Sequence, residues 1–240
     1  MEPTLHDRSN DDDHPIVLVI DDDPDVREGL KALLQSVNLR SEAFGCVPEF
    51  FRYKLPDKVS CLIVDVRLPG LSGLDFQIEL AKVQIDIPII FITGYGDISM
   101  SVQAMRAGAV EFLTKPFRQQ DLLDAIRAAL ERDRKRREHD KMTHDLRIRF
   151  GGLSPREKEV MTLVATGLMN KQVAAEIGIS EVTVKVHRHN LMKKLDAKSL
   201  AELVRMADTV GLPHRTYMPN GPSDGDLKRQ VMSETEKVSA

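Results

Sequence analysis

The chain has 240 residues, of which 42% are hydrophobic, and it carries a formal net charge of −3. This charge joins an acidic half, with 12 Lys and Arg against 21 Asp and Glu in residues 1–125, to a basic half, with 18 against 12 in residues 126–212, so we predict two domains with different partners. Because the sequence has no membrane-length apolar run, no signal peptide and only two cysteines, we exclude membrane-spanning and disulfide-rich classes and expect a cytoplasmic protein without a membrane partner.

Apolar and amphipathic segments alternate along the first half. The apolar runs predict strands at 16–20, 41–44, 61–65, 88–92 and 109–113, and helix-like stretches begin near Pro24, Pro48, Gly73, Asp97 and Gln119. Near-continuous Val, Ile and Leu runs are typical of parallel strands that are covered on both faces. We therefore predict a flavodoxin-like, doubly wound α/β domain with a five-stranded parallel sheet over residues 15–127. We predict that a disordered acidic tail at 1–14 precedes it.

The second half has a helical pattern. Residues 128–150 are charged on nearly every face, and we interpret them as a charged helical linker. Residues 151–212 predict a small all-α domain of four helices, and residues 213–240 predict a flexible tail. The start signals are a capping box of Ser154 with Glu157, and caps at Asn170 and Ser180; the stop signals are Gly167 and Gly178. The third helix runs to Leu195 and the fourth spans 198–210.

Acidic residues gather where the predicted strands end. Asp21 and Asp22 follow the strand at 16–20, and Asp65 ends the strand at 61–65. Neighbouring parallel strands lie roughly 5 Å apart, so these carboxylates share one pocket at the carboxyl edge of the sheet. Three carboxylates in one pocket are hard to ionise together unless a divalent cation joins them, and such oxygen ligands suit Mg²⁺. Thr93 and Lys115, at two other strand ends, add a hydroxyl and an ammonium group. We therefore predict that Asp65 is a nucleophile that forms an acyl phosphate.

These residues together resemble the receiver domain of two-component response regulators, over residues 15 to about 130. The resemblance implies that Asp21 and Asp22 bind the metal, that the Arg67 main-chain carbonyl adds a ligand, and that Asp65 is the phospho-acceptor. It implies that Thr93 is the switch hydroxyl, Lys115 the family's lysine before a cis proline, and Phe112 the switch aromatic. It also implies a dimer face with Val102, Met105, Arg106 and Phe117, and control of water access by Arg67 and Tyr95.

The third helix of the basic half carries cations along much of its surface. We expect Val182, Val186, Leu191 and Leu195 on its apolar side. The stretches LSPREKEV, GLMNKQVAAEIGIS and TVKVHRHNLMKKL resemble a LuxR-type helix-turn-helix, so the whole chain resembles the FixJ/NarL family of response regulators. The resemblance implies that Lys185, Val186 and His189 face the bases. It implies phosphate contacts for Lys171, Thr183, Arg188, Lys193 and Lys194.

The function that this resemblance implies is a DNA-binding transcriptional regulator switched by phosphorylation. Its expected partners are a sensor histidine kinase as phosphodonor, double-stranded promoter DNA, RNA polymerase and a second copy of the chain, with Mg²⁺ as cofactor. Phosphorylation either drives dimerisation or releases the helix-turn-helix, and the sequence leaves both open. Activation of transcription is the expected outcome. The receiver is expected to catalyse only its own phosphorylation and dephosphorylation.

Two other classes of function use the same features. A Mg²⁺-dependent phosphatase of the haloacid-dehalogenase type places a second acid two residues after its nucleophile, but Arg67 stands at that position. A signalling module whose basic half binds a protein is the other alternative. Sequence-preferring duplex binding with a steep salt dependence separates that alternative from a transcription factor.

Overall fold

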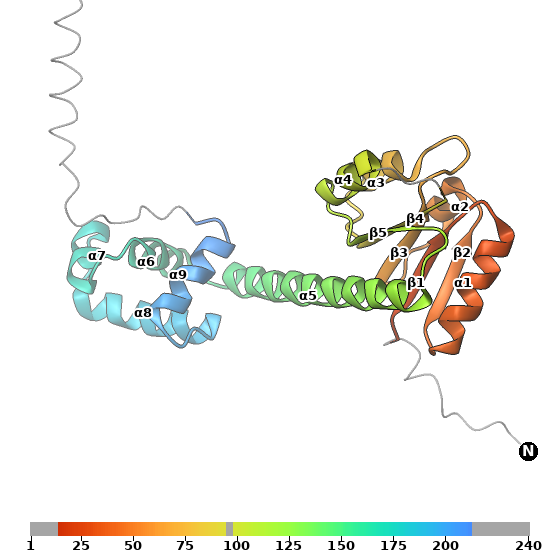
Figure 1. Ribbon diagram of the computed structural model, residues 1–240. Helices are drawn as coiled ribbons and strands as arrows, with labels where there is room; N and C mark the ends of the chain where they lie inside the picture. Colours follow the sequence, from red (N-terminus) through yellow and green to blue (C-terminus); the bar gives the residue numbers. More distant parts are fainter. Residues whose placement is uncertain (1–13, 95–97, 213–240) are drawn as a thin grey trace, which may run out of the picture. The chain divides into compact units, whose positions relative to one another are not determined.

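The computed structural model describes residues 14–94 and 98–212 (Figure 1). Its residues divide between Asp140 and Lys141 into two compact units, which are described separately. Within the described ranges, no helix has both the length and the apolar character needed to cross a membrane. The predicted tails and Tyr95 lie outside the described ranges, apart from His14.

A parallel sheet forms the centre of the first unit, and the predicted fold is confirmed. In the described residues its strand order is β2-β1-β3-β4-β5, and each neighbouring pair is parallel. The strands are β1 (Ile16–Ile20), β2 (Arg40–Phe44), β3 (Ser60–Asp65), β4 (Ile89–Thr93) and β5 (Glu111–Thr114). Every residue of β1, β3 and β4 is buried, which explains their unbroken apolar runs.

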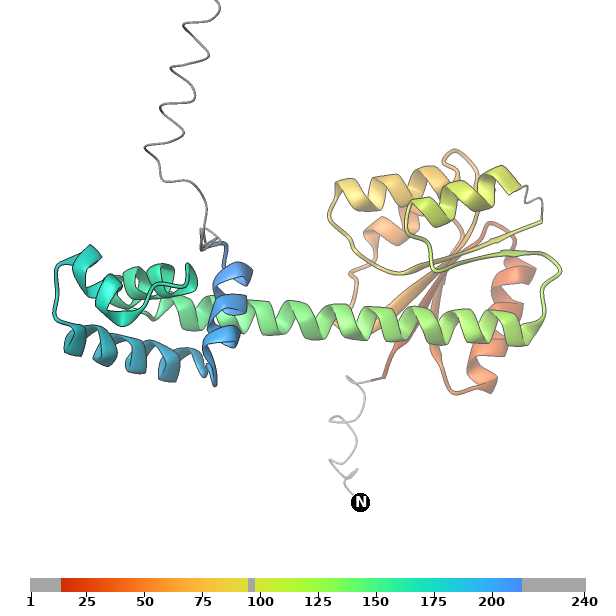
Figure 2. The same cartoon turned by 60° about the vertical axis from the view of Figure 1, so that its left-hand side comes forward.

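Helices cover both faces of this sheet, as a doubly wound fold requires (Figures 1 and 2). Helices α1 (Pro24–Ser36) and α5 (Gln119–Gly151) lie on one face, where Leu34 and Leu122 pack with Val17 and Ile63. Helices α2 (Val47–Arg52), α3 (Gly73–Lys82) and α4 (Ile98–Arg106) lie on the other face. The sheet therefore has an apolar core on each face. The described helices do not cover the edge at which the strands end, where the predicted pocket residues lie.

Strand β5 corrects one predicted boundary. The apolar pattern predicts a strand from residue 109, but β5 begins at Glu111. The Ala109 amide donates instead to the carbonyl of Ala104 in α4 (3.1 Å), and Gly108 before it has a φ of 92°. Ala109 thus closes the helix and is not available to pair with β4. The strand start at residue 109 was wrong because the apolar pattern does not reveal this turn.

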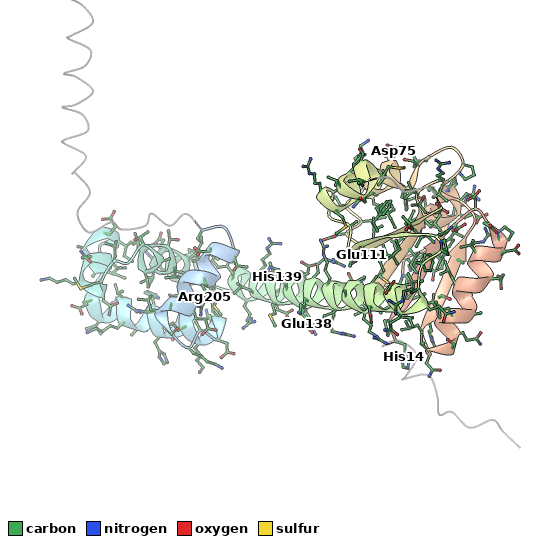
Figure 3. The ribbon with its side chains drawn as sticks, viewed as in Figure 1. His14, Asp75, Glu111, Glu138, His139 and Arg205 are labelled. Carbon is green, nitrogen blue, oxygen red and sulfur yellow. The ribbon has the colours of Figure 1, made fainter. Side chains whose placement is uncertain are left out.

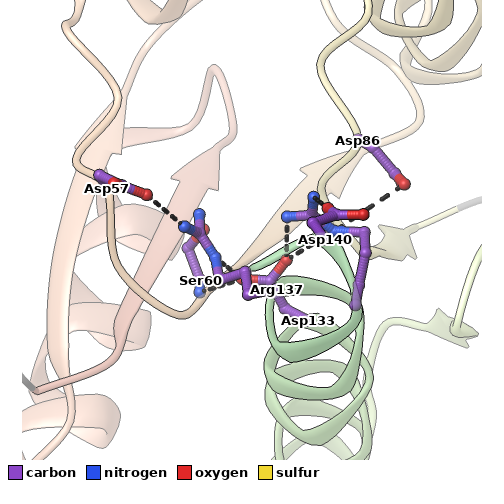
Figure 4. Close-up of polar contacts among 7 residues, drawn as sticks. Asp57, Ser60, Asp86, Asp133, Arg137 and Asp140 are labelled. Atoms are coloured by element: carbon purple, nitrogen blue, oxygen red, sulfur yellow. Dashed lines mark hydrogen bonds and ion pairs between the residues drawn. The ribbon is translucent and has the colours of Figure 1, made fainter. Parts of the chain in front are cut away.

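A buried acid ties α5 to the amino edge of the sheet (Figure 4). The Asp133 side chain is fully buried and accepts a hydrogen bond of 2.9 Å from the Ser60 amide. Arg136 and Arg137 donate to its two carboxylate oxygens at 2.6 and 2.7 Å. The side chains of Glu138 and His139, further along α5, are exposed (Figure 3).

The segment read as a linker therefore contributes to the first unit. Asp133 lies within residues 128–150, where the sequence pattern suggested only solvated charge, yet it is buried against the start of β3. The last turns of α5 contribute to the second unit, where Leu146 is buried. The predicted domain boundaries themselves stay a prediction.

The second unit is helical as predicted. Helices α6 (Pro155–Ala165), α7 (Asn170–Ile177), α8 (Glu181–Leu195) and α9 (Leu200–Thr209) pack around one core that includes Val160, Val173 and Leu203. The capping box is present, because Ser154 Oγ accepts from the Glu157 amide and Glu157 Oε2 accepts from the Ser154 amide. Gly167, Gly178 and the Ser180 cap end and begin helices as expected.

Two details of the second unit correct the sequence reading. Asn170 is not the cap of α7: it is the first helical residue, and its side chain accepts a hydrogen bond of 3.0 Å from Arg188 on α8. Val182 and Val186 are 69% and 52% exposed, whereas Val184 is fully buried. At 3.6 residues per turn, Val184 aligns with Leu191 and Leu195, while Val182 and Val186 fall near the opposite face.

Candidate functional site

The strand register brings the predicted pocket residues to one edge of the sheet. Ile20 pairs with Val64, so Asp21 and Asp65 follow at the same level on neighbouring strands. Thr93, the last residue of β4, pairs with Thr114, directly before Lys115. The parallel order β1-β3-β4-β5 therefore places these side chains together beyond the carboxyl ends of the strands.

Lys115 joins the two buried acids of this pocket. Its Nζ lies 2.7 Å from Asp21 Oδ2 and 2.7 Å from Asp65 Oδ2. The Asp21 side chain is fully buried, whereas the side chains of Asp65 and Lys115 are 10% and 23% exposed. Asp65 is thus reachable from solvent while its charge is compensated. The Lys115–Pro116 peptide bond is cis, as the resemblance implies.

The electrostatics of the pocket follow from burial and from this pairing. Burial raises the pKa of the Asp21 carboxyl above its ordinary value of 3.8, although Lys115 and the Asp23 amide oppose the rise. Burial lowers the pKa of the Lys115 ammonium, but the carboxylates of Asp21 and Asp65 outweigh it and raise that pKa above 10.5. Lys115 is therefore charged at neutral pH and is a fixed cation beside Asp65.

Backbone amides hold each carboxylate in place. Asp21 Oδ1 accepts from the Asp23 amide, and Asp65 Oδ1 accepts from the Arg67 amide, both at 2.9 Å. Asp23 caps α1, since its side chain accepts from the amides of residues 25 and 26. The backbone of Asp65 also requires a glycine at position 73, because a Cβ there would lie 2.5 Å from the Asp65 carbonyl oxygen. Sequence reasoning found Gly73 only as a helix start.

The acidic residues fit a divalent cation. Carboxylate oxygens of Asp21, Asp22 and Asp65 lie within 4.8 Å of one another, and Asp22 is exposed. Hard oxygen donors with an open side suit Mg²⁺, which keeps several waters when it binds. The described residues therefore provide a donor set of the right chemistry for the ion that the sequence predicted.

Thr93 and Phe112 lie beside the pocket on neighbouring strands. Thr93 is fully buried, and its carbonyl accepts a hydrogen bond of 2.7 Å from the Lys115 amide. The Phe112 ring is half-buried, with its centroid 6.4 Å from that of Phe91. The two residues thus lie on neighbouring strands beside the pocket. Their predicted roles as switch hydroxyl and switch aromatic stay predictions.

Helix α8 presents part of its basic side chains and two valines, Val182 and Val186, outward. Lys185 is exposed and pairs with Glu181 at 3.1 Å, and His189 and Lys193 are also exposed. Val186 lies on the same outward face, and Lys171 is exposed on α7. A helix with an exposed strip of this chemistry suits the major groove, where cations and methyl groups meet base edges and phosphates.

Three predicted phosphate contacts have partners inside the unit. Arg188 Nη1 donates to Asn170 Oδ1 at 3.0 Å, and Lys194 Nζ lies 2.7 Å from Glu157 Oε2. The Thr183 amide donates to Ser180 Oγ at 3.1 Å, and the two hydroxyls lie 2.8 Å apart. Arg188 and Lys194 therefore hold α8 against α7 and α6. Their predicted contact with DNA stays a prediction.

Comparison with known proteins matches the two halves of the chain to two families. Residues 17–127 match the family described as response regulator receiver domain. Residues 152–207 match the family described as bacterial regulatory proteins, luxR family. The chain belongs to the two-component response regulators with a LuxR-type DNA-binding domain. This response regulator is thus a DNA-binding transcription regulator, and the phosphatase alternative is set aside.

Several relatives span most of this response regulator. Nodulation protein W of Bradyrhizobium diazoefficiens is 59% identical over 197 residues, which cover 82% of this chain and 87% of that protein. Response regulator protein TmoT of Ectopseudomonas mendocina is 45% identical and also covers 82% of this chain, with 90% of its own length. FixJ of Azorhizobium caulinodans is 40% identical, over 82% of this chain and 93% of that protein. The solved structure of response regulator StyR has 49% identity and a TM-score of 0.70, and covers 81% of this chain and 98% of its own.

Proposed function

We propose that a sensor histidine kinase switches this response regulator by transferring a phosphoryl group to Asp65. The observation that carries the proposal is the double contact of Lys115 Nζ, 2.7 Å from both Asp21 and Asp65. It places a cation beside a partly exposed carboxylate whose other oxygen is fixed by the Arg67 amide. These contacts fix the orientation of the carboxylate, and the 10% exposure of the Asp65 side chain leaves access for a donor that arrives from solvent.

In the proposed transfer, an Asp65 carboxylate oxygen attacks phosphorus. The new oxygen–phosphorus bond forms as the bond from phosphorus to the kinase's histidine nitrogen breaks, and that nitrogen keeps the electron pair. The Lys115 ammonium stabilises charge on one phosphoryl oxygen, and the Thr93 hydroxyl donates to another. A Mg²⁺ ion held by Asp21, Asp22, Asp65 and the Arg67 carbonyl supplies further positive charge to these oxygens when bound. Hydrolysis of the acyl phosphate returns the carboxylate.

The proposed signal leaves the pocket through Thr93. When Thr93 moves toward the phosphoryl group, Phe112 turns into the space beside it, and the surface of α4 and β5 changes shape. That surface already exposes apolar side chains, with Val102 42% and Met105 45% exposed. We infer that this face forms the homodimer after phosphorylation, or that its change releases the helix-turn-helix.

The proposed output is promoter binding by α8, with activation of transcription through RNA polymerase. Lys185, Val186 and His189 on the outward strip read bases, while Lys171 and Lys193 contact phosphates. The exposure of Val182 and Val186 supports this role, because valine methyl groups on a helix surface suit the thymine methyl in the major groove. A homodimer would place two such helices on the half-sites of an inverted repeat.

The proposal is tested by substituting the acceptor. With acetyl phosphate and Mg²⁺, the wild-type protein should gain one phosphate adduct in intact-mass spectrometry, and Asp65→Asn should gain none. The matched control is Asp25→Asn, which neutralises an exposed acid in the first turn of α1 and should label normally. Adduct formation by Asp65→Asn at the wild-type rate would refute the assignment of the acceptor.

A further inference from the structure

The C-terminal end of α8 is held by a residue that lies outside the helix-turn-helix. Arg149, in the last turn of α5, donates from Nη1 to the main-chain carbonyl of Leu195 at 3.0 Å. Leu195 is the last residue of α8, and carbonyls in a last helical turn have no partner within their helix. The guanidinium therefore satisfies one of these carbonyls and places positive charge at the negative end of the helix dipole.

The backbone around this carbonyl shows why an outside donor is needed. After α8 the chain enters the left-handed region at Asp196, which has a φ of 58°. The amides of Asp196 and Ala197 donate to the carbonyls of Lys193 and Met192, at 3.3 and 2.9 Å. These two bonds satisfy carbonyls of the last helical turn, but they leave the carbonyl of Leu195 itself, which accepts its hydrogen bond from Arg149.

Arg149 reaches α8 from a helix that is itself anchored. Leu146, one turn before it, is only 7% exposed within the core of the second unit, and Phe150 packs against the same core. The Lys158 ammonium lies 5.0 Å from the centroid of the Phe150 ring. The last turns of α5 are thus part of the framework that surrounds α8, and the guanidinium is held at a defined place.

Two other polar contacts link α8 to neighbouring described helices, one from the middle of α8 and one from its last turn, beside Leu195. Arg188 joins it to α7 through Asn170, and Lys194 joins it to α6 through Glu157. The Arg149 bond adds a third direction, from α5, at the end of the helix. Three links from three helices restrain both the position and the tilt of α8, on which the outward strip of Lys185 and His189 depends.

We propose that Arg149 is a positioning residue for DNA recognition, which sets the tilt of α8 by bonding to Leu195 and does not itself contact DNA. The inference rests on the proposed function, because it requires that α8 reads bases. The proposal also gives the last turn of α5 a structural role, which is to position α8. The helix that begins in the receiver ends with a direct bond to the base-reading element.

The test compares two arginines of α5 in the full-length protein. Arg149→Ala and Arg147→Ala each remove one positive charge from an exposed side chain, and the positions are two residues apart. The probes are a duplex selected from random DNA by the wild-type protein and a scrambled duplex of equal composition. Affinities for both are measured by fluorescence anisotropy over a range of salt concentrations.

We expect Arg149→Ala to bind the selected duplex about three- to tenfold more weakly than Arg147→Ala, a loss within the usual net range for one hydrogen bond that is partly exposed to solvent. Binding to the scrambled duplex and the slope of affinity against salt should be equal in the two variants, because neither side chain contacts phosphate. Arg149→Lys, which keeps the charge and a donor, should recover most of the lost specificity. Partial unfolding would lower binding to both duplexes alike, so the ratio of the two affinities isolates positioning.

Three results would overturn the inference. Equal affinity of the two alanine variants for the selected duplex would show that the bond to Leu195 does not matter for recognition. A salt slope reduced by about one in Arg149→Ala alone would show a direct phosphate contact. An equal loss on both duplexes would show a general defect. A wild-type protein without any sequence preference would instead overturn the proposed function, and the inference with it.

Discussion

At the scale of single residues, Gly73 controls the shape of the acceptor pocket. A Cβ at this position would lie 2.5 Å from the Asp65 carbonyl oxygen and 3.1 Å from the Val66 Cα, both of them backbone atoms that cannot yield cheaply. The glycine thus lets α3 begin in close contact with the backbone of Asp65. Its amide also donates to the Val66 carbonyl at 2.9 Å, which links the helix start to the strand end.

We expect Gly73→Ala to lower the free energy of unfolding by about 1–3 kcal/mol, the usual cost of overpacking, and to slow labelling by acetyl phosphate. Gly29→Ala is the matched control, since a Cβ there meets no described atom within 4 Å. In the interior of α1 it should raise stability by about 0.5–1 kcal/mol. Urea unfolding and labelling rates measure both effects. Normal labelling in a stable Gly73→Ala would contradict this account.

Glu157 gives the second unit a contribution to stability that we expect to depend on pH. Burial raises the pKa of its carboxyl, but the hydrogen bonds from Lys194 and from the Ser154 amide outweigh burial and hold that pKa below 4.5. Because the pKa is lower in the folded state, Glu157 contributes stability that is fully present above its unfolded pKa. The contribution is lost as pH falls through the folded value.

We therefore expect the Glu157 carboxyl, followed by NMR through its side-chain carbon, to titrate below pH 4.5 in the wild-type protein. In Lys194→Met the titration should move to higher pH, because the charged partner is gone while burial remains. Lys193→Met removes a neighbouring exposed cation and should leave the titration in place. A midpoint unchanged by Lys194→Met would rule out this ion pair as the cause.

At the scale of elements, α5 is anchored by Asp133 rather than by its apolar face alone. Asp133 is fully buried and its two oxygens accept bonds from Ser60, Arg136 and Arg137. Arg137 also pairs with Asp57 at 2.7 Å, so the network joins the helix to the segment before β3.

Burial and the Asp133 charge together raise the pKa of the neighbouring Cys61 thiol, which keeps that thiol protonated.

Removal of this acid should leave the buried Ser60 amide without its acceptor and take one of their acidic partners from both Arg136 and Arg137, which keep Asp140 and Asp57. We expect Asp133→Ala to lower the free energy of unfolding by about 3–5 kcal/mol and to speed hydrogen exchange at the Ser60 amide. Asp124→Ala on the same helix removes an exposed pair with Arg127 and should cost less than about 1 kcal/mol. Equal stabilities of the two variants would show that the network does not anchor α5.

At the scale of the whole molecule, phosphorylation and assembly are proposed to be coupled through α4. In sedimentation velocity, acetyl phosphate should shift the wild-type protein toward a dimer, because the changed α4 face exposes a matching apolar surface to a second copy. Val102→Asp, which places a charge on that face, should stay monomeric while it still labels at Asp65. Val37→Asp is the control, since Val37 is similarly exposed, at 40% against 42%, but follows α1 on the other side of the sheet.

A labelled wild-type protein that stays monomeric would refute dimerisation as the route. The release of the helix-turn-helix would then be the remaining mechanism, and tighter DNA binding by the labelled monomer would support it. The two routes are thus separated by one measurement of mass and one of affinity on the same sample.

The sequence was enough to predict the parallel sheet, apart from the start of β5, and to predict that the pocket residues lie together, while the roles of those residues stay predictions. Unbroken apolar runs end at Asp21, Asp65 and Thr93, and parallel pairing brings the ends of such runs together whatever the helices do. Capping signals are equally local: the predicted caps at Ser154 and Ser180 are confirmed, whereas the predicted cap at Asn170 was wrong, because that residue is the first of helix α7. Each of these features depends on residues within a few positions of one another or on strand order.

Only the tertiary structure decided the contacts between helices. The Asp133 bond to Ser60 spans 73 positions and the Arg149 bond to Leu195 spans 46, and no local pattern distinguishes these residues from other charges on α5. The inward valine of α8, by contrast, is Val184 rather than Val182 or Val186, and the sequence did contain this information, because a period of 3.6 residues aligns Val184 with Leu191 and Leu195. The local sequence does not show whether a charged residue of a helix is exposed or buried, because its burial depends on which other element packs against it.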